Sequence, residues 1–355
     1  MIRLAVPTPA SWAVPLAVLL AGLLLAEPAV ARDKREVKDW WSACDNVRAC
    51  TAYGFSSEDV DGVALRVRRP AGRNAPPLFD LVLGPEQGRG VVGPLDLFVD
   101  GKAVARTDAP EGGNDDFRTW AVADGATLSA AIARGAGLEL RAGKKTVATV
   151  SLSGASAVLR WIDDRQKRVG GVTALVAKGP APAAAVPAPP LAPLIRAARA
   201  VSQKGLTDAP PAPVLKRLAG LDCAAGNPAL DGPVSSRLGP GLVLWVIPCW
   251  VGAYQTASAL VLADEAGGHA RLADLGDGEG GGPRAADERA MATNASYDAD
   301  HQKLYSYAKG RGVADCGITE TRVWTGKAFI LSDRSELSAC RGLPEEFWVT
   351  TFRSR

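Results

Sequence analysis

The stretch DWWSACDNVRAC, residues 39–50, places two tryptophans directly before a pair of cysteines, Cys44 and Cys50. The turn-forming residues Asp45 and Asn46 lie between the cysteines, and the tryptophans supply apolar area on which a closed loop can be anchored. Such a pair can be a metal clip, a redox centre or a disulfide staple. The compartment of the chain and its other cysteines and histidines decide among these three.

The start of the chain has the pattern of an export signal. Arg3 precedes an apolar run at residues 12–26, and residues 29–31, AVA, form the small-residue pattern of a cleavage site. An uncleaved membrane anchor would need roughly 20 apolar residues, and this run is shorter. We therefore expect residues 1–31 to be removed by a cut after Ala31, which leaves a periplasmic chain without a transmembrane segment.

The charge balance gives no sign of a nucleic-acid partner. The chain has 41 lysines and arginines against 38 acidic residues, a net charge of +3. Loss of residues 1–31 removes one of each sign, Arg3 and Glu27, and leaves that value unchanged. Nucleic-acid binding would need basic residues gathered on one face, so we expect no nucleic acid among the partners.

The cysteines are better suited to disulfides than to metal or redox chemistry. The chain has only two histidines, His269 and His301, and no Cys-x-x-Cys motif, so neither a zinc site nor a thioredoxin-like centre is expected, and no cofactor. Six cysteines in an exported chain form an even set that an oxidising compartment keeps paired. Among the 15 possible connectivities, neighbour spacing favours Cys44–Cys50, Cys223–Cys249 and Cys316–Cys340.

Residues 32–178 have the pattern of a strand-rich domain. Apolar and polar residues alternate at 63–67 and 95–99, with an Asp100-Gly101 turn after the second run, and a further hairpin is predicted at 138–150 around Gly143. Residues 128–132 have helical spacing that Gly135 ends. Ala155, Val158, Leu159 and Ile162 then recur at amphipathic spacing, and this predicts a helix with Ser153 as its N-cap.

A connector and a second strand-rich domain follow. Residues 179–220 begin with a Pro/Ala-rich linker, and short helices are predicted at 194–204 and 213–218. Residues 221–355 form the second domain, in which the predicted strands are 242–247, 254–262, 303–309 and 322–331, the last turning at 325–327. Residues 276–282, rich in glycine, are expected to form a loop.

Three separated motifs resemble a known bacterial family, domain of unknown function 1176. They are residues 39–50, residues 151–166 (SLSGASAVLRWIDDRQ) and residues 309–317 (KGRGVADCG). The first domain is also similar to the invasion-associated locus B proteins, which are exported β-sandwich proteins. The resemblance implies an exported envelope protein and no established reaction. One departure is Ala314, where the motif favours a second glycine before the aspartate.

The expected fold is therefore mainly β with some α, an α+β chain. It comprises an N-terminal β-sandwich-like domain, a helical Pro/Ala-rich connector and a C-terminal antiparallel β domain.

Two groups of polar residues are candidate ligand sites. Asp163, Asp164 and Arg165 can form an acid-base cluster or a binding strip, although i,i+4 pairs with Lys167 and Arg168 favour a solvated helix face. A hairpin tip holds Asp298 and Asp300 beside His301, and the alternatives there are a plain polar turn or a carbohydrate or calcium contact.

The third candidate is the KGRG motif. Lys309 and Arg311 alternate with glycines whose backbone can approach an anion closely. The alternative is a turn or bulge that directs Cys316 toward Cys340, with both cations in solvent.

No catalytic residue is assigned. The sequence lacks the nucleophile motif Gly-x-Ser-x-Gly and the metalloprotease motif His-Glu-x-x-His, and it lacks the combination of Ser-x-x-Lys with its partner motifs. We therefore expect a non-enzymatic binding or structural module of the periplasm, with an unknown envelope ligand or protein as its partner. The alternative is a carboxylate-dependent envelope hydrolase or carbohydrate-active protein.

Overall fold

The computed structural model describes residues 34–57, 60–112, 116–221, 223, 230–276, 285 and 287–355. The predicted signal peptide and most of the predicted glycine-rich loop lie outside this described part. Contacts group residues 32–355 into one compact unit, and the predicted domain limits at 178 and 221 stay a prediction. Within the described residues, no helix combines the length and the apolarity needed to cross a membrane.

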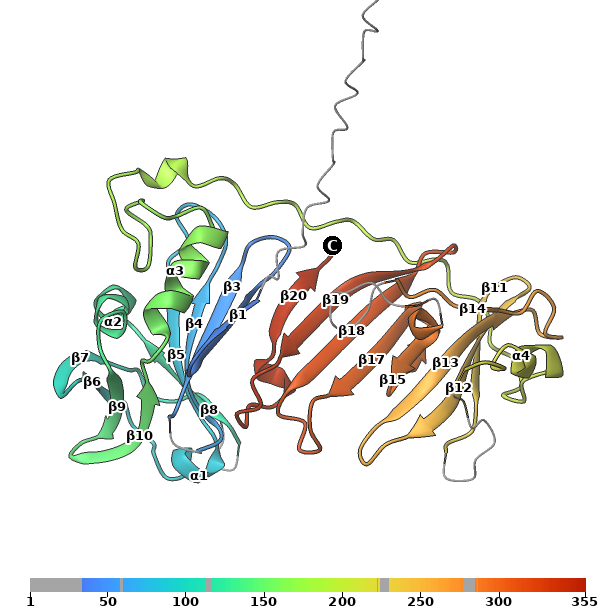
Figure 1. The fold of residues 1–355 in the computed structure, drawn as a ribbon, viewed down its shortest axis with the longest axis horizontal. Coiled ribbons are helices and arrows are strands. Elements are labelled where there is room, and N and C mark those ends of the chain that lie inside the picture. The colour runs from blue at the N-terminus through green and yellow to red at the C-terminus, as the bar shows by residue number, and fades with distance from the viewer. Residues whose placement is uncertain are drawn as a thin grey trace, which may run out of the picture. The chain divides into compact units, whose positions relative to one another are not determined.

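The first sheet has six antiparallel strands in the order β1-β2-β3-β4-β5-β8 (Figure 1). These strands are β1 Lys34–Val37, β2 Trp40–Cys44, β3 Cys50–Phe55, β4 Val63–Arg69, β5 Leu78–Leu83 and β8 Arg118–Val122. Cys44 and Cys50 are directly paired across β2 and β3, and their disulfide closes this hairpin. The opening stretch is therefore a stapled hairpin, as predicted.

The second sheet has four antiparallel strands in the order β10-β9-β6-β7. These are β6 Asp96–Val99, β7 Lys102–Arg106, β9 Gly137–Ala142 and β10 Lys145–Ser151. Helix α1, Pro85–Gly88, precedes β6, α2, Gly125–Ile132, precedes β9, and α3, Ala155–Arg165, follows β10. One buried apolar core contains Leu81 of the first sheet, Leu140 of the second and Ile162 of α3. Two sheets around a shared core confirm the predicted sandwich-like arrangement, and both predicted hairpins form.

Two more antiparallel sheets occupy the C-terminal part (Figure 1). One contains β11 Val234–Gly239, β12 Leu242–Val251, β13 Thr256–Ala263, β14 Arg271–Leu272 and β15 Met291–Thr293, and the other contains β16 Ser296–Asp298, β17 Lys303–Lys309, β18 Gly317–Trp324, β19 Phe329–Leu337 and β20 Val349–Arg353. Leu260 of β13, Leu304 of β17 and Trp324 of β18 belong to one buried cluster, so these sheets share a core. The fold is mainly β with some α, as predicted.

An apolar cluster joins the beginning and the end of the folded unit. The cluster contains Trp41, Tyr53 and Phe55 of the first sheet. They pack with Phe347 and Trp348, the two residues directly before β20. The Tyr53 hydroxyl also donates to the Phe347 carbonyl at 2.6 Å. Because this cluster is buried, the six-stranded sheet has an apolar core against each of its two faces.

The connector differs from its prediction in one element. Helix α4, Ala212–Lys216, forms near the predicted 213–218 helix, but no helix forms at residues 194–204. The Ile195 N–H donates to the Arg355 carbonyl at 3.0 Å, and the Ala198 N–H donates to the Trp324 carbonyl at 2.8 Å. The segment therefore runs irregularly along the last strands, because these tertiary hydrogen bonds compete with its weak helical preference.

The start of α3 also differs. Its N-cap is Gly154, not Ser153, and the cap has no side-chain hydrogen bond. Gly154 has a φ of 102°, and a Cβ built there would lie 2.0 Å from the Val37 carbonyl oxygen. The helix starts one residue later than Ser153 would place it, because only glycine fits this close approach to β1.

Candidate functional site

A hollow of about 410 Å³ lies on the face of the β16–β20 sheet that is turned away from its apolar core. Its lining combines two tyrosines with hydroxyl, amide and carboxylate side chains and includes Asn294, Ser296, Tyr305, Tyr307, Thr319, Thr321, Asp333, Ser335 and Glu345. Such a mixture of aromatic area and fixed polar groups is typical of ligand sites.

Strand register places these side chains in rows. Tyr305 of β17 is opposite Thr321 of β18, which is opposite Asp333 of β19. One row further, Tyr307 is opposite Thr319. Since alternate residues of a strand point to the same face, both rows lie on one surface of the sheet. Ser306 lies between the two tyrosines and is buried, and Leu304, which precedes Tyr305, belongs to the buried apolar core.

The two tyrosines differ in environment. Tyr305 is 38% exposed, whereas Tyr307 packs against Trp348 with ring centroids 5.5 Å apart. Burial raises the pKa of the Tyr307 phenol above its ordinary value, and the negative charge of Glu345 adds to this. Tyr307 is therefore a neutral hydroxyl at physiological pH, able to donate and to accept a hydrogen bond.

Asp333 is the carboxylate that belongs to the first of these rows, where it is opposite Thr321. Partial burial raises its pKa, while the positive charges of Arg353 and Lys303 act in the opposite direction. Glu320 also contributes to the hollow, but its side chain is 3% exposed and pairs with Arg322 at 2.5 Å. Asp333 and Glu345 are therefore the carboxylates available to a ligand.

A smaller hollow of about 150 Å³ is lined by residues of β20 and of β3 and β4 in the first sheet. Its polar lining includes Tyr53, Arg66, Arg68, Glu346 and Arg353. Arg66 and Arg68 both bond the Asp80 carboxylate, at 3.2 and 2.9 Å. Burial raises the pKa of Tyr53 to about 12. Since the charges of Arg66 and Arg68 are already balanced in part by Asp80, the larger hollow is the stronger candidate for a ligand site.

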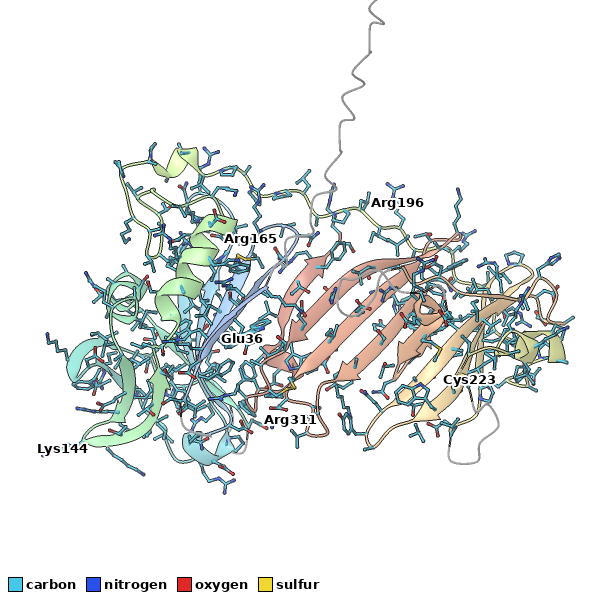
Figure 2. All side chains as sticks on the ribbon, in the orientation of Figure 1. Glu36, Lys144, Arg165, Arg196, Cys223 and Arg311 are labelled. Carbon is cyan, nitrogen blue, oxygen red and sulfur yellow. A yellow bond between two sulfur atoms is a disulfide. The ribbon has the colours of Figure 1, made fainter. Side chains whose placement is uncertain are left out.

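In the predicted anion site, Lys309 is the last residue of β17. Arg311 lies in the loop that follows this strand (Figure 2). Arg311 bonds the Asp315 carboxylate through two nitrogens, at 2.6 and 2.5 Å, and Asp61 at 2.9 Å. Lys309 lies over the Tyr307 ring, 5.7 Å from its centroid. The guanidinium thus already has two carboxylate partners, and an external anion would compete with them.

The cluster at the end of α3 is divided by burial. Asp163 is fully buried and accepts three backbone hydrogen bonds, from Leu175 at 2.7 Å, Val176 at 2.9 Å and Ala177 at 3.0 Å. Asp164 is 66% exposed, and its nearest cation is Lys167 at 3.9 Å.

The prediction of i,i+4 ion pairs from Asp163 and Asp164 to Lys167 and Arg168 is therefore wrong. The helix ends at Arg165 and the chain then turns, so that Lys167 takes a φ of 58° and Arg168 is buried. Arg165 lies over the Trp161 ring, 5.7 Å from its centroid (Figure 2). Asp164 and Arg165 stay predicted ligand residues, whereas the third, Asp163, has no access to solvent.

Asp298 and Asp300 occupy the predicted hairpin tip between β16 and β17. Asp298 accepts bonds from the backbone of Asp300 and His301, both at 3.0 Å, and lies 2.7 Å from His301 Nδ1. The backbone bond from His301 and the contact with its ring lower the pKa of Asp298. The turn interpretation accounts for these contacts.

Sequence reasoning missed the tyrosines and threonines of the larger hollow. The signal was present, because Lys303, Tyr305, Tyr307 and Lys309 alternate along a strand that was predicted. Thr319 and Thr321 could not be found in the same way. They are opposite the tyrosines only in the register in which β18 pairs with β17, and the loop between these strands hides that register from the sequence. A search for aromatic residues on the polar face of predicted strands would have found the first half of the site.

Comparison with known proteins gives three findings. The family model described as a protein of unknown function, DUF1176, matches residues 34–355. The uncharacterized protein YpfG of Escherichia coli strain K12 is 29% identical over 339 residues, which cover 89% of this chain and 90% of that protein. The crystal structure of invasion associated protein B from Bartonella henselae is 23% identical with a TM-score of 0.29, covering 38% of this chain and 98% of that chain.

Proposed function

This chain belongs to the DUF1176 family of proteins of unknown function, and on that premise we propose that it is an exported, non-enzymatic binding module of the cell envelope that binds a glycan. The binding surface in this proposal is the hollow on the polar face of the β16–β20 sheet.

The observation that carries the proposal is the side-chain mixture of this hollow. Tyr305 presents an exposed ring, and Thr319, Thr321 and Ser335 present hydroxyls from neighbouring strands. A sugar has apolar C–H faces that pack on aromatic rings and many hydroxyls that need hydrogen-bond partners. Asp333 and Glu345 add charged acceptors, which form stronger hydrogen bonds than neutral ones.

Export is supported by the cysteines. All six are paired in the disulfides Cys44–Cys50, Cys223–Cys249 and Cys316–Cys340, the connectivity that neighbour spacing predicted. Structural disulfides persist in oxidising compartments such as the periplasm and are rare in reducing ones. The predicted cut after Ala31 is consistent with the same location.

The alternative is a carboxylate-dependent hydrolase that uses the same hollow. One observation favours it: the pKa of Asp333 is raised by burial, as in a general acid, and Glu345 lies in the same lining. Under this alternative Asp333 and Glu345 replace the earlier candidates, since Asp163 has no access to solvent.

The test is a binding titration of the mature chain with chitohexaose and a pull-down with insoluble peptidoglycan. Tyr305→Ala should weaken binding by about tenfold, the equivalent of about 1.4 kcal/mol. Tyr254→Ala is the matched control, because Tyr254 is similarly exposed, at 40%, but lies outside the hollow. Binding of neither glycan, or equal losses in both variants, would contradict the proposal.

A second readout separates binding from turnover. Chromatography of each glycan after incubation should show no shortened product. Products that form with the native chain and vanish in Asp333→Asn, with unchanged folding, would establish the hydrolase alternative instead.

A further inference from the structure

A third hollow, of about 380 Å³, lies in the N-terminal part of the chain. It is bordered by the segment after β4, by α2 and by the segment after α3, and none of its lining residues belongs to the β16–β20 sheet. The lining residues that matter for its chemistry are Arg69, Arg73, Pro76, Pro77, Val172 and Lys178. We call this surface the arginine hollow.

The buried side chains at and behind its wall carry more positive charge than negative charge. Arg69 is 2% exposed and Arg168, which packs next to it, is 1% exposed. Asp163 is the buried carboxylate beside them, and its two oxygens accept backbone hydrogen bonds from residues 175–177. Among the described residues, neither arginine has a carboxylate within salt-bridge distance, so two buried cations face one buried anion.

The contacts of Arg69 show how its charge is accommodated. Its two terminal nitrogens donate to the carbonyls of Ala75, at 2.6 Å, and Thr173, at 2.7 Å. Its Nε is buried without a hydrogen-bond partner among the described residues. Burial, together with the positive charge of the neighbouring Arg168, lowers the pKa of Arg69 to about 10. A negative charge that comes close would therefore stabilise the Arg69 cation.

The rim adds two more cations. Arg73 and Lys178 are exposed, and no carboxylate lies in the described lining of the arginine hollow. Between the cations the surface is apolar, with Pro76, Pro77 and Val172, which is 55% exposed. A concave wall with charge of one sign and low polarisability concentrates its field on an ion of the opposite sign.

We propose that the arginine hollow binds an organic anion, namely a carboxylate or a phosphate ester that bears a small apolar group. Arg73 and Lys178 contact the anionic group, the buried Arg69 attracts it through its uncompensated charge, and the apolar group packs on the prolines. This site is independent of the glycan surface, because the two hollows share no lining residue.

The test is calorimetric titration of the mature chain with four probes: phenyl phosphate, benzoate, inorganic phosphate and benzyl alcohol. Phenyl phosphate or benzoate should bind, inorganic phosphate should bind more weakly, and the neutral alcohol should not bind. The first two probes distinguish a phosphate ester from a carboxylate as the preferred group. Binding should weaken as sodium chloride rises, because salt screens exposed charges.

The decisive variant is the double substitution Arg73→Gln and Lys178→Gln, in which both residues are exposed and folding is expected to be unaffected. It should weaken the better probe by about tenfold or more. Its control is Lys144→Gln with Lys145→Gln, at the tip of the β9–β10 hairpin (Figure 2), which removes the same charge outside the arginine hollow. Equal losses in both double variants, binding of benzyl alcohol as tight as that of the anions, or no binding of any probe would overturn the proposal.

Discussion

Arg311 Nη2 lies 2.9 Å from a carboxylate oxygen of Asp61, a residue 250 positions earlier in the chain. The same guanidinium bonds Asp315, whose carboxylate also accepts the Gly342 N–H at 2.6 Å. Arg311 of the KGRG motif therefore connects loops that are far apart in the sequence. Its predicted role in anion binding would require a ligand to displace Asp61.

Asp315→Asn should destabilise the protein more than Asp61→Asn. The Asp315 side chain is 6% exposed and bonds both a cation and a backbone N–H, whereas Asp61 is 58% exposed. We expect a loss of about 1–3 kcal/mol in the free energy of unfolding for the first and below about 1 kcal/mol for the second. Urea unfolding of both variants measures the difference, and equal losses would count against this account.

The same carboxylate should make stability depend on pH. Burial opposes ionisation of Asp315, but the hydrogen bonds from Arg311 and Gly342 outweigh it and hold its pKa below the ordinary value. A lowered pKa in the folded state adds stability above the unfolded pKa, about 3.9, and this stability is lost as the pH falls below it. Between pH 6 and pH 3, the native chain should lose more stability than Asp315→Asn. Parallel curves would show that Asp315 is not a source of this dependence.

Asp163→Asn and Asp164→Asn form a matched pair of neighbours. Asp163 accepts three backbone hydrogen bonds while buried beside Arg69 and Arg168, and an amide group cannot accept all three. We expect a loss of about 3 kcal/mol for Asp163→Asn and at most about 0.5 kcal/mol for the exposed Asp164→Asn. Thermal unfolding with circular dichroism gives both values. Similar melting temperatures would refute the structural role of Asp163.

Gly154→Ala and Gly72→Ala separate steric crowding from backbone strain. Both glycines have nearly the same φ, 102° and 104°, but a Cβ at Gly154 would lie 2.0 Å from the Val37 carbonyl oxygen, while nothing lies within 4 Å at Gly72. The Gly72 variant should lose about 1 kcal/mol from its unfavourable φ, and the Gly154 variant clearly more. Denaturant unfolding of the two variants tests this, and a Gly154→Ala protein as stable as Gly72→Ala would contradict the close contact.

Local parts of the fold were predictable because their signals are local. Alternation identified β4 and β6, glycine at position 143 marked a hairpin turn, and neighbour spacing gave the three disulfides. The 194–204 segment failed for the opposite reason. Its backbone partners, Trp324 and Arg355, lie more than a hundred positions away, and no local pattern reports them.

The candidate sites show the same division. Asp163 follows Ala155 and Leu159 at intervals of four, so the helical period already placed it on the apolar face with them. Its adjacency to Asp164 suggested a solvated strip instead. The arginine hollow needed tertiary information, because Arg69 ends β4 whereas Lys178 follows α3. Only the fold brings these cations together.

The residue at position 314 shows how a departure from the family motif can be tested. Ala314 has a φ of 59°, the left-handed region that glycine adopts without penalty, and glycine was the residue expected there from the motif. Ala314→Gly should therefore stabilise the protein by about 0.5–1 kcal/mol, since relief of strain exceeds the entropy that glycine adds to the unfolded chain. Ala299→Gly, in a hairpin tip and without a positive φ, should instead destabilise by a similar amount. Urea unfolding of both variants should show changes of opposite sign, and a loss of stability in both would mean that the left-handed turn at Ala314 is not strained.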